Sequence, residues 1–273
     1  MRIVQALVIA GFGINCEDET AAAYRLAGAT AHTAHLESVL RGDVRLDAFD
    51  IVHLPGGFSF GDDLGAGRVL ANRIRTRLLP GGATMGDGLR AVARRGGMVI
   101  GICNGFQALV ELGLVPNVGG EGAAEAALMQ NVSGRYENRW VRVRADAECP
   151  ARVWAGLEDW ELPVRHGQGR LVFRDPGLRD EVARLHLNGL TYCDGDGRPT
   201  RAYPANPNGA ELACAALCDP SGRILGVMPH PEAYLSLFNH YDWPRLRREC
   251  PERSEEGKGL MLFRNVVKAV LAA

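Results

Sequence analysis

The sequence predicts an α/β fold, a doubly wound and mostly parallel sheet with helices on both faces. Apolar runs of strand length, such as residues 98–102 (Met-Val-Ile-Gly-Ile), lack polar alternation, which is typical of strands covered on both sides. They alternate with helical stretches through the first half of the chain. With 273 residues, 47% of them hydrophobic, the chain is long enough to bury such a sheet.

The elements of the first half follow from these patterns. Strands are expected at residues 3–10, 30–36, 50–54 and 98–102. Helices are expected at about residues 19–27, 69–79, 89–95 and 104–112, and Gly28 is expected to end the first of them.

The second half changes character, because turn-forming residues separate shorter apolar runs. Strands are expected at residues 140–144, 171–173, 211–217 and 224–227, extending the same sheet with some antiparallel pairing. Residues 257–271 predict an amphipathic helix, and residues 236–257 an elaborated surface loop. Without a repeat or a low-complexity linker, residues 1–273 are interpreted as one domain.

Composition excludes several classes of function. A net charge of −1 gives no reason to expect nucleic acid or an anionic membrane as a partner. The seven cysteines form no C-x-x-C pair, so no metal site is expected and a reducing compartment is the simplest account. The apolar residues 1–14 lack a signal-peptide cleavage pattern and no run is long enough to span a bilayer, so we expect a cytoplasmic protein.

The sharpest motif lies where a predicted strand passes directly into a helix at Cys103. Gly101 and Gly105 flank the cysteine two positions away on each side, which is the layout of a nucleophile elbow. The thiol then stands over a helix N-terminus, where free amides and the helix dipole favour the thiolate. The backbone amide of Asn104 can donate to a developing oxyanion. A buried structural cysteine is the ordinary alternative, and the flanking glycines favour the nucleophile.

A base and its orienting group are expected just after the strand at 224–227. His230 lies between two prolines that restrict its backbone, and Glu232 is near enough along the chain to hold the imidazole in one tautomer. Parallel strands end at one edge of a sheet, so His230 and Cys103 can meet there. The Gly-Gly pair at 56–57, after the strand at 50–54, exposes backbone amides suited to a second oxyanion donor.

Three motifs in this order, at residues 55–57 (Pro-Gly-Gly), 101–107 and 229–232, resemble the class I (triad) glutamine amidotransferases. The stretches that are similar to the glutaminase subunits of phosphoribosylformylglycinamidine synthase, a purine-pathway enzyme, lie at residues 55–62, 131–137, 163–170 and 206–209. The likeness runs from the loop at 13–16 to Glu232, and it implies a flavodoxin-like sheet.

This resemblance implies roles for single residues. Cys103 would attack the side-chain amide of glutamine to form a thioester, His230 would move the proton, and Glu232 would orient His230. The amides of Gly57 and Asn104 would form the oxyanion hole, and Gln107 would shape the glutamine pocket. No cofactor is implied on this chain. ATP and Mg²⁺ are expected on a large synthetase subunit that receives the ammonia, with a small accessory subunit completing the complex.

Two departures and two alternatives accompany the resemblance. The family usually has glutamate in a His-Gly-Glu-Gly motif, and this chain has Gln168 there; His166 of that motif could face the synthetase or be structural. The tail through residues 240–243 (His-Tyr-Asp-Trp) is longer than in the shortest family members, and it is either an extra docking surface or a solvated loop. A stand-alone cysteine hydrolase or peptidase of related fold, and a non-catalytic regulatory module, remain as other functions. The residue after the cysteine, Asn104 rather than histidine, argues against the hydrolase, and the intact triad argues against the module.

Overall fold

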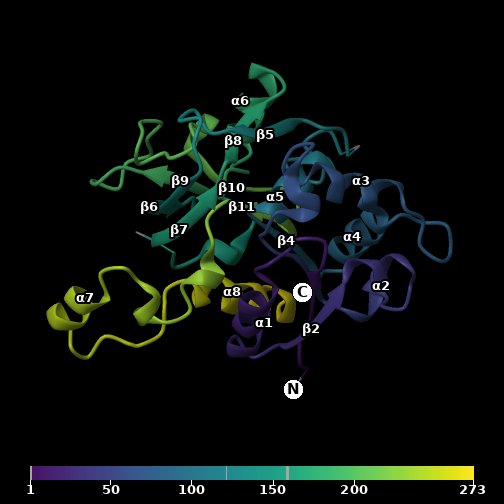
Figure 1. Ribbon diagram of the computed structural model, residues 1–273, viewed down its shortest axis with the longest axis horizontal. Helices are drawn as coiled ribbons and strands as arrows, with labels where there is room; N and C mark the ends of the chain where they lie inside the picture. The colour runs from purple at the N-terminus through teal and green to yellow at the C-terminus, as the bar shows by residue number, and fades with distance from the viewer. Residues whose placement is uncertain (1, 121, 158–159) are drawn as a thin grey trace.

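The computed structural model describes residues 2–120, 122–157 and 160–273. Its centre is a nine-stranded sheet in the order β2-β1-β3-β4-β11-β10-β9-β6-β7 (Figure 1). These strands are β1 (Gln5–Ala10), β2 (Thr30–His35), β3 (Ile51–Leu54), β4 (Met98–Ile102), β6 (Glu137–Ala145), β7 (Trp160–His166), β9 (Leu190–Cys193), β10 (Cys214–Cys218) and β11 (Ile224–Val227). The predicted α/β class, with a mostly parallel core, is confirmed.

The parallel half contains β2, β1, β3, β4 and β11, which pair in register as neighbours. Strands β3, β4 and β11 are buried along their whole lengths, which explains why their sequences lack polar alternation. Ile102 at the end of β4 pairs with Val227 at the end of β11, so the loops after both strands leave the sheet side by side. This edge of the sheet is where α/β sites assemble.

The remaining strands of the large sheet, β10, β9, β6 and β7, are antiparallel to their neighbours. The antiparallel extension predicted for the second half is therefore present, with one correction. Residues 171–173 do not join it: they belong to β8 (Gln168–Phe173), which pairs with β5 (Ala126–Gln130) in a separate two-stranded sheet. Such short runs carry no signal for which sheet they enter, because partner choice depends on contacts distant in sequence.

Helices cover both faces of the sheet. They are α1 (Glu17–Leu26), α2 (Leu36–Leu40), α3 (Arg68–Thr76), α4 (Met85–Arg94), α5 (Asn104–Glu111), α6 (Pro176–Arg184), α7 (Trp243–Glu249) and α8 (Leu260–Leu271). On one face α1 and α8 meet, where Tyr24 packs edge-on against Phe263 and both rings contact His53 of β3. Helices α3, α4 and α5 form the other group (Figure 1).

Several strand ends differ from the expected residues; for example, β1 begins at Gln5 rather than at residue 3, and β6 begins at Glu137 rather than at residue 140. Two of the differences have a local cause. Strand β2 stops at His35 rather than at Leu36, because the His35 ring accepts a hydrogen bond from the backbone of Glu37 and begins α2. Residues 211–213 form a 3₁₀ turn (η4, Glu211–Ala213), with Leu212 at a positive φ of 53°, so the following strand begins at Cys214. A hydrophobic run alone does not reveal such turns.

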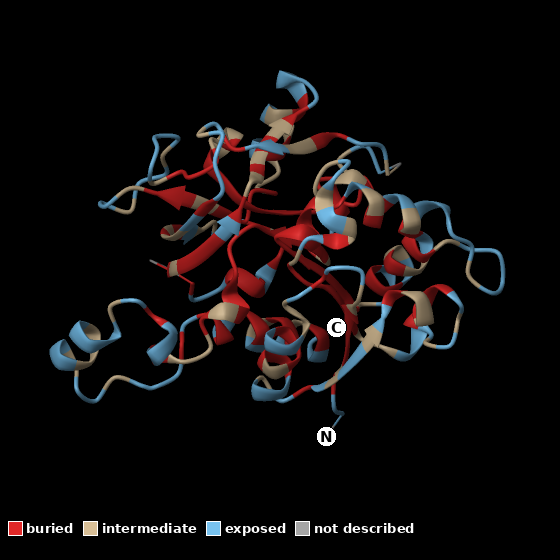
Figure 2. Ribbon diagram, in the orientation of Figure 1, coloured by how far each residue is buried: buried red, intermediate tan, exposed pale blue. Residues whose placement is uncertain are grey.

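Residues 236–257 project from the body, and they include the 3₁₀ turn η6 (Leu237–Asn239) and α7. None of the residues of α7 is buried, and the segment is largely exposed in Figure 2. The other short 3₁₀ turns are η1 (Leu46–Ala48), η2 (Ser59–Asp62), η3 (Arg152–Trp154) and η5 (Pro231–Ala233). Among the described residues, the helices are all too short or too polar to cross a membrane.

Candidate active site

Cys103 occupies a sharp turn between β4 and α5. Its backbone has φ 50° and ψ −101°, a region that non-glycine residues rarely adopt. A Cβ atom added to Gly105 would lie 1.8 Å from the carbonyl oxygen of Leu54, and one on Gly101 would lie 2.5 Å from the backbone of Gly105. Both glycines are therefore required by close backbone approach, and together they force the cysteine into the turn.

His230 and Glu232 follow β11, the strand next to β4. The Nδ1 atom of His230 lies 2.5 Å from a carboxylate oxygen of Glu232, and each residue is 2% exposed. The backbone amide of His230 donates to the carbonyl of Pro163 at 2.9 Å. Among the described residues, Nε2 of His230 has no hydrogen-bond partner, which leaves that nitrogen free to exchange a proton.

The electrostatics of His230 suit proton transfer with a thiol. Burial lowers the pKa of His230, but the Glu232 carboxylate and the neighbouring Cys103 and Cys16 thiols more than offset this and raise the pKa well above its usual range. The thiol of Cys103 also approaches the carbonyl oxygen of Arg165 at 3.5 Å. The arrangement can hold an imidazolium beside a thiolate, the ion pair that activates a cysteine nucleophile.

Cys16 also lies close to this imidazole, and sequence reasoning assigned it no role. It follows β1, and its backbone amide and that of Asn15 both donate to the carbonyl oxygen of Gly56, at 3.3 and 3.1 Å. Burial raises the pKa of the Cys16 thiol, and the neighbouring His230 ring opposes that rise. The available signal was its position: β1 also ends at the carboxyl edge of the parallel strands.

A pocket of about 180 Å³ opens beside the thiol. Among the residues named from the sequence, Gly57, Cys103, Gln107, His166 and Gln168 line it, and Tyr136 and Arg165 complete much of its wall. Gly57 has φ 150°, and a Cβ there would lie 2.6 Å from the carbonyl of Gly13, so glycine is required at this position. The pocket is small and partly polar, a fit for a short amide side chain rather than a large ligand.

The side chains of Asn104 and Gln107 form a buried network under the pocket. The Asn104 amide accepts from the backbone of Ser59 at 3.1 Å and donates to Gln107 Oε1 at 2.9 Å and to Asp62 at 3.2 Å. Gln107 in turn donates to the carbonyl of Gln168 at 2.6 Å. Both side chains are thus occupied within the protein. The backbone amide of Asn104 lies at the first position of α5, where the helix itself supplies no acceptor, so it can donate to another group.

The structure accounts for Gln168, which departs from the family motif, and for His166 in the same motif. The side-chain oxygen of Gln168 accepts from the backbone amide of Ala66 at 3.0 Å, so a neutral amide can anchor the loop after η2. His166 is 2% exposed and lies 3.1 Å from the Asn131 side chain, so it does not form part of the surface. Burial lowers the pKa of His166 to about 3, and the ring is neutral at pH 7.

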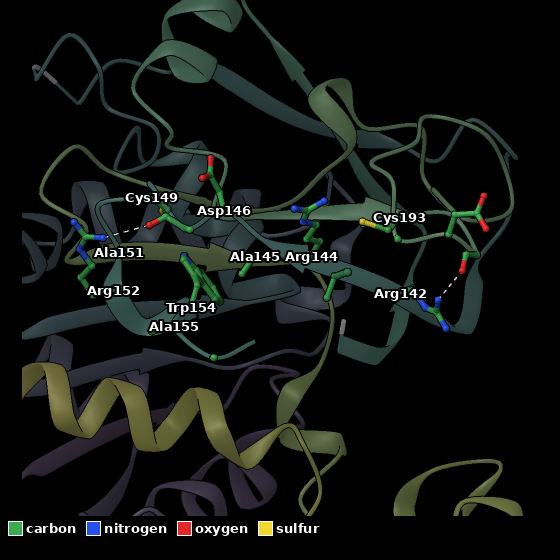
Figure 3. A pocket seen from close by; sticks show the side chains of 16 residues that line it. Arg142, Arg144, Ala145, Asp146, Cys149, Ala151, Arg152, Trp154, Ala155 and Cys193 are labelled. Carbon is green, nitrogen blue, oxygen red and sulfur yellow. Dashed lines mark hydrogen bonds between the residues drawn. The ribbon is translucent and has the colours of Figure 1, made fainter. Parts of the chain in front are cut away.

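A larger pocket, of about 550 Å³, lies along β6 and the turn after β9 (Figure 3). Its described lining residues include none of the residues predicted for catalysis. Arg142 donates to the carbonyl of Gly195 and Arg152 to that of Ala147, and aspartates line the same space. Mixed charges of this kind do not select one class of ligand, so we place the chemistry at the smaller pocket.

Comparisons with known proteins show the family to which the chain belongs. A family model described as CobB/CobQ-like glutamine amidotransferase domain matches residues 3–270. The PurQ subunit of phosphoribosylformylglycinamidine synthase from Dehalococcoides mccartyi is 39% identical over 268 residues, 98% of each chain. A Methanococcus maripaludis PurQ subunit is 36% identical over 97% of each chain. The Thermotoga maritima PurLQS structure superposes with a TM-score of 0.69 at 26% identity, covering 98% of this chain and 99% of that one. The chain belongs to the CobB/CobQ-like glutamine amidotransferase family, and it is an enzyme of that class.

Proposed function

We propose that this chain is the glutaminase subunit of phosphoribosylformylglycinamidine synthase, hydrolysing glutamine to glutamate and ammonia. The observation that carries the proposal is the aligned pair of Cys103 and the His230–Glu232 couple at the ends of two adjacent parallel strands. The end-to-end similarity to PurQ subunits supports the choice of the purine enzyme.

The first half of the reaction forms a thioester. The Cys103 thiolate attacks the side-chain amide carbon of glutamine, and the amide oxygen becomes an oxyanion that accepts from the backbone amides of Gly57 and Asn104. His230 holds the thiol proton and gives it to the leaving nitrogen, so the C–N bond breaks and ammonia departs. Glu232 keeps Nδ1 protonated, and this presents Nε2 to the reacting groups.

The second half consumes water. His230, now neutral, takes a proton from a water molecule that attacks the thioester carbonyl, and the same two amides hold the new oxyanion. The C–S bond then breaks and restores the Cys103 thiolate beside His230, which keeps the proton taken from water, so the starting ion pair is formed again. The product acid gives its own proton to solvent and leaves as glutamate. Gln107 contributes by shaping the pocket wall, because both ends of its side-chain amide are already hydrogen-bonded.

The ammonia needs a protected destination, and the mouth of the pocket supports a docked partner. Phe58 and Tyr136 lie with ring centroids 6.3 Å apart and are about half exposed, with Leu64 exposed on the nearby loop. Exposed apolar groups around a catalytic opening are typical of an interface. We place ATP and Mg²⁺ on the large synthetase subunit that docks here, with a small accessory subunit, in the cytoplasm.

The substitution Cys103→Ser tests the proposal in the assembled complex. We expect glutamine-dependent amidine synthesis to disappear while synthesis from added ammonia persists, because only the ammonia source is lost. Cys250→Ser, at a cysteine outside the pocket, is the matched control and should keep both activities. Loss of the ammonia-dependent activity in the serine variant, or covalent labelling by a diazo-ketone glutamine analogue at a cysteine other than Cys103, would contradict the assignment.

A further inference from the structure

Three side chains of different metal-binding chemistry, one of them the imidazole of His230, lie close together beside the catalytic cysteine. The Cys16 sulfur, a ring nitrogen of His230 and a carboxylate oxygen of Glu232 all lie within 4.8 Å of one another. They come from two segments far apart in sequence, which is why no metal-binding spacing is visible along the chain. The proposed mechanism gives Cys16 no role, so this cluster is not explained by catalysis alone.

Two buried polar atoms in the cluster are unsatisfied. Among the described residues, Nε2 of His230 and the second carboxylate oxygen of Glu232 have no hydrogen-bond partner, although both residues are 98% buried. Buried polar atoms without partners are rare and costly, and each one calls for a ligand or a reacting group. The Cys16 sulfur and the His230 ring lie next to the same backbone position, Gly56. A Cβ atom added there would lie 2.8 Å from the His230 ring and 3.2 Å from the Cys16 sulfur.

The donor set is the one that Zn²⁺ prefers. Sulfur, imidazole nitrogen and carboxylate oxygen bind zinc at about 2.0–2.3 Å, so neighbouring ligand atoms in a tetrahedral site lie roughly 3.3–3.6 Å apart. In the structure the three ligand atoms lie within 4.8 Å of one another, and His230 Nδ1 is 2.5 Å from the Glu232 carboxylate. To bind one ion, Glu232 has to move about 1 Å away from Nδ1 while the Cys16 sulfur closes the remaining gap. The Cys16 backbone is held by the carbonyl of Gly56, so the side chains can close without moving the loop.

We propose that Cys16, His230 and Glu232 form an inhibitory Zn²⁺ site whose occupation stops glutamine hydrolysis. Zinc on Nδ1 replaces the hydrogen bond by which Glu232 fixes the tautomer. The inhibitory consequence rests on the proposed function, and metal binding itself does not.

Cobalt(II) provides a readout that is independent of activity, because thiolate ligation gives an intense charge-transfer band. We expect the full-length protein and Cys103→Ser to show this band, Cys16→Ser to lose it, and Cys250→Ser to retain it. A Cys103→Ser protein that binds cobalt would keep the metal site testable even if the glutaminase assignment failed. An unchanged band in Cys16→Ser would overturn the proposal.

Zinc titration of glutaminase activity then tests the consequence. Disturbing a metal site beyond its direct ligands costs 10–100-fold in affinity, so loss of the Cys16 ligand should raise the inhibitory zinc concentration by at least about 10-fold. Cys250→Ser should be inhibited like the unmodified enzyme, and a chelator should restore activity in both. Equal zinc sensitivity of Cys16→Ser and the unmodified enzyme would also refute the site.

Discussion

Replacing Cys103 by glycine and by alanine separately measures the strain stored at the elbow. Alanine keeps the Cβ atom and therefore the unfavourable backbone at φ 50° and ψ −101°, whereas glycine relieves it. A residue held in such a sparsely populated region costs about 1–3 kcal/mol. Cys214, buried in an ordinary extended conformation with φ −68°, is the matched control.

The expected magnitudes follow from these two backbones. At position 214, the glycine variant should have a free energy of unfolding about 1–2 kcal/mol lower than the alanine variant, because glycine adds backbone entropy to the unfolded chain and lacks a buried methyl group. At Cys103, the relieved strain of about 1–3 kcal/mol should cancel or reverse that difference. For 273 residues, 1 kcal/mol shifts the melting temperature by roughly 2 °C, so the contrast between the two positions should be about 2–6 °C.

Urea unfolding of the four variants, followed by circular dichroism, measures the contrast directly. At each position, the free energy of unfolding of the alanine variant is subtracted from that of the glycine variant, and the two differences are then compared. The loss of the thiol cancels in this comparison, because all four variants lack it. If glycine destabilises both positions by the same amount, the elbow is not strained, and the argument that the fold forces the sulfur into position fails.

Two further perturbations address His230 and His166. Glu232→Gln removes the charge that raises the pKa of His230, so the rate of ammonia release should fall by roughly 10²-fold or more. The limb of the pH–rate profile that belongs to His230 should also move to lower pH. An unchanged profile would exclude Glu232 as the positioning residue. His166 has a pKa of about 3 when folded and near 6.5 when unfolded, so the unfolded chain binds more protons between these values. Its contribution to stability is complete above pH 6.5 and is lost as the pH falls toward 3, by at most about 1.4 kcal/mol per pH unit. Urea midpoints for His166→Asn should therefore depend less steeply on pH over this window than those of the unmodified protein.

The parallel half of the fold was predictable because its signals are local. Strand β4 and strand β11 begin and end at the predicted residues, since continuous apolar runs bounded by glycine or proline leave few alternatives. The second half of the fold was less predictable from the sequence. Strands β5, β7 and β9 and helix α6 had no expectation, because short strands with polar positions resemble turns until their partners are known.

In the candidate site, too, local features could be predicted from the sequence and contacts between distant segments could not. Cys103, Gly101 and Gly105 could be interpreted from one short motif, because the turn itself requires those residue types. The roles of Cys16 and Gln168 could not, because each is defined by a contact made across the fold: a thiol beside His230, and an amide oxygen that receives the Ala66 backbone. Sequence patterns report on neighbours along the chain, and these contacts join separate elements.

Stability alone does not explain why the triad is built as it is. A buried imidazole and carboxylate cost desolvation energy, and the pair leaves two polar atoms without partners among the described residues. Cys103 adds conformational strain on the adjacent strand. Strands β4 and β11 are buried throughout and pair in register, so the surrounding packing can hold both unfavourable features in place. Two unfavourable features at the ends of neighbouring strands are expected where reactivity, rather than stability, determines the residues.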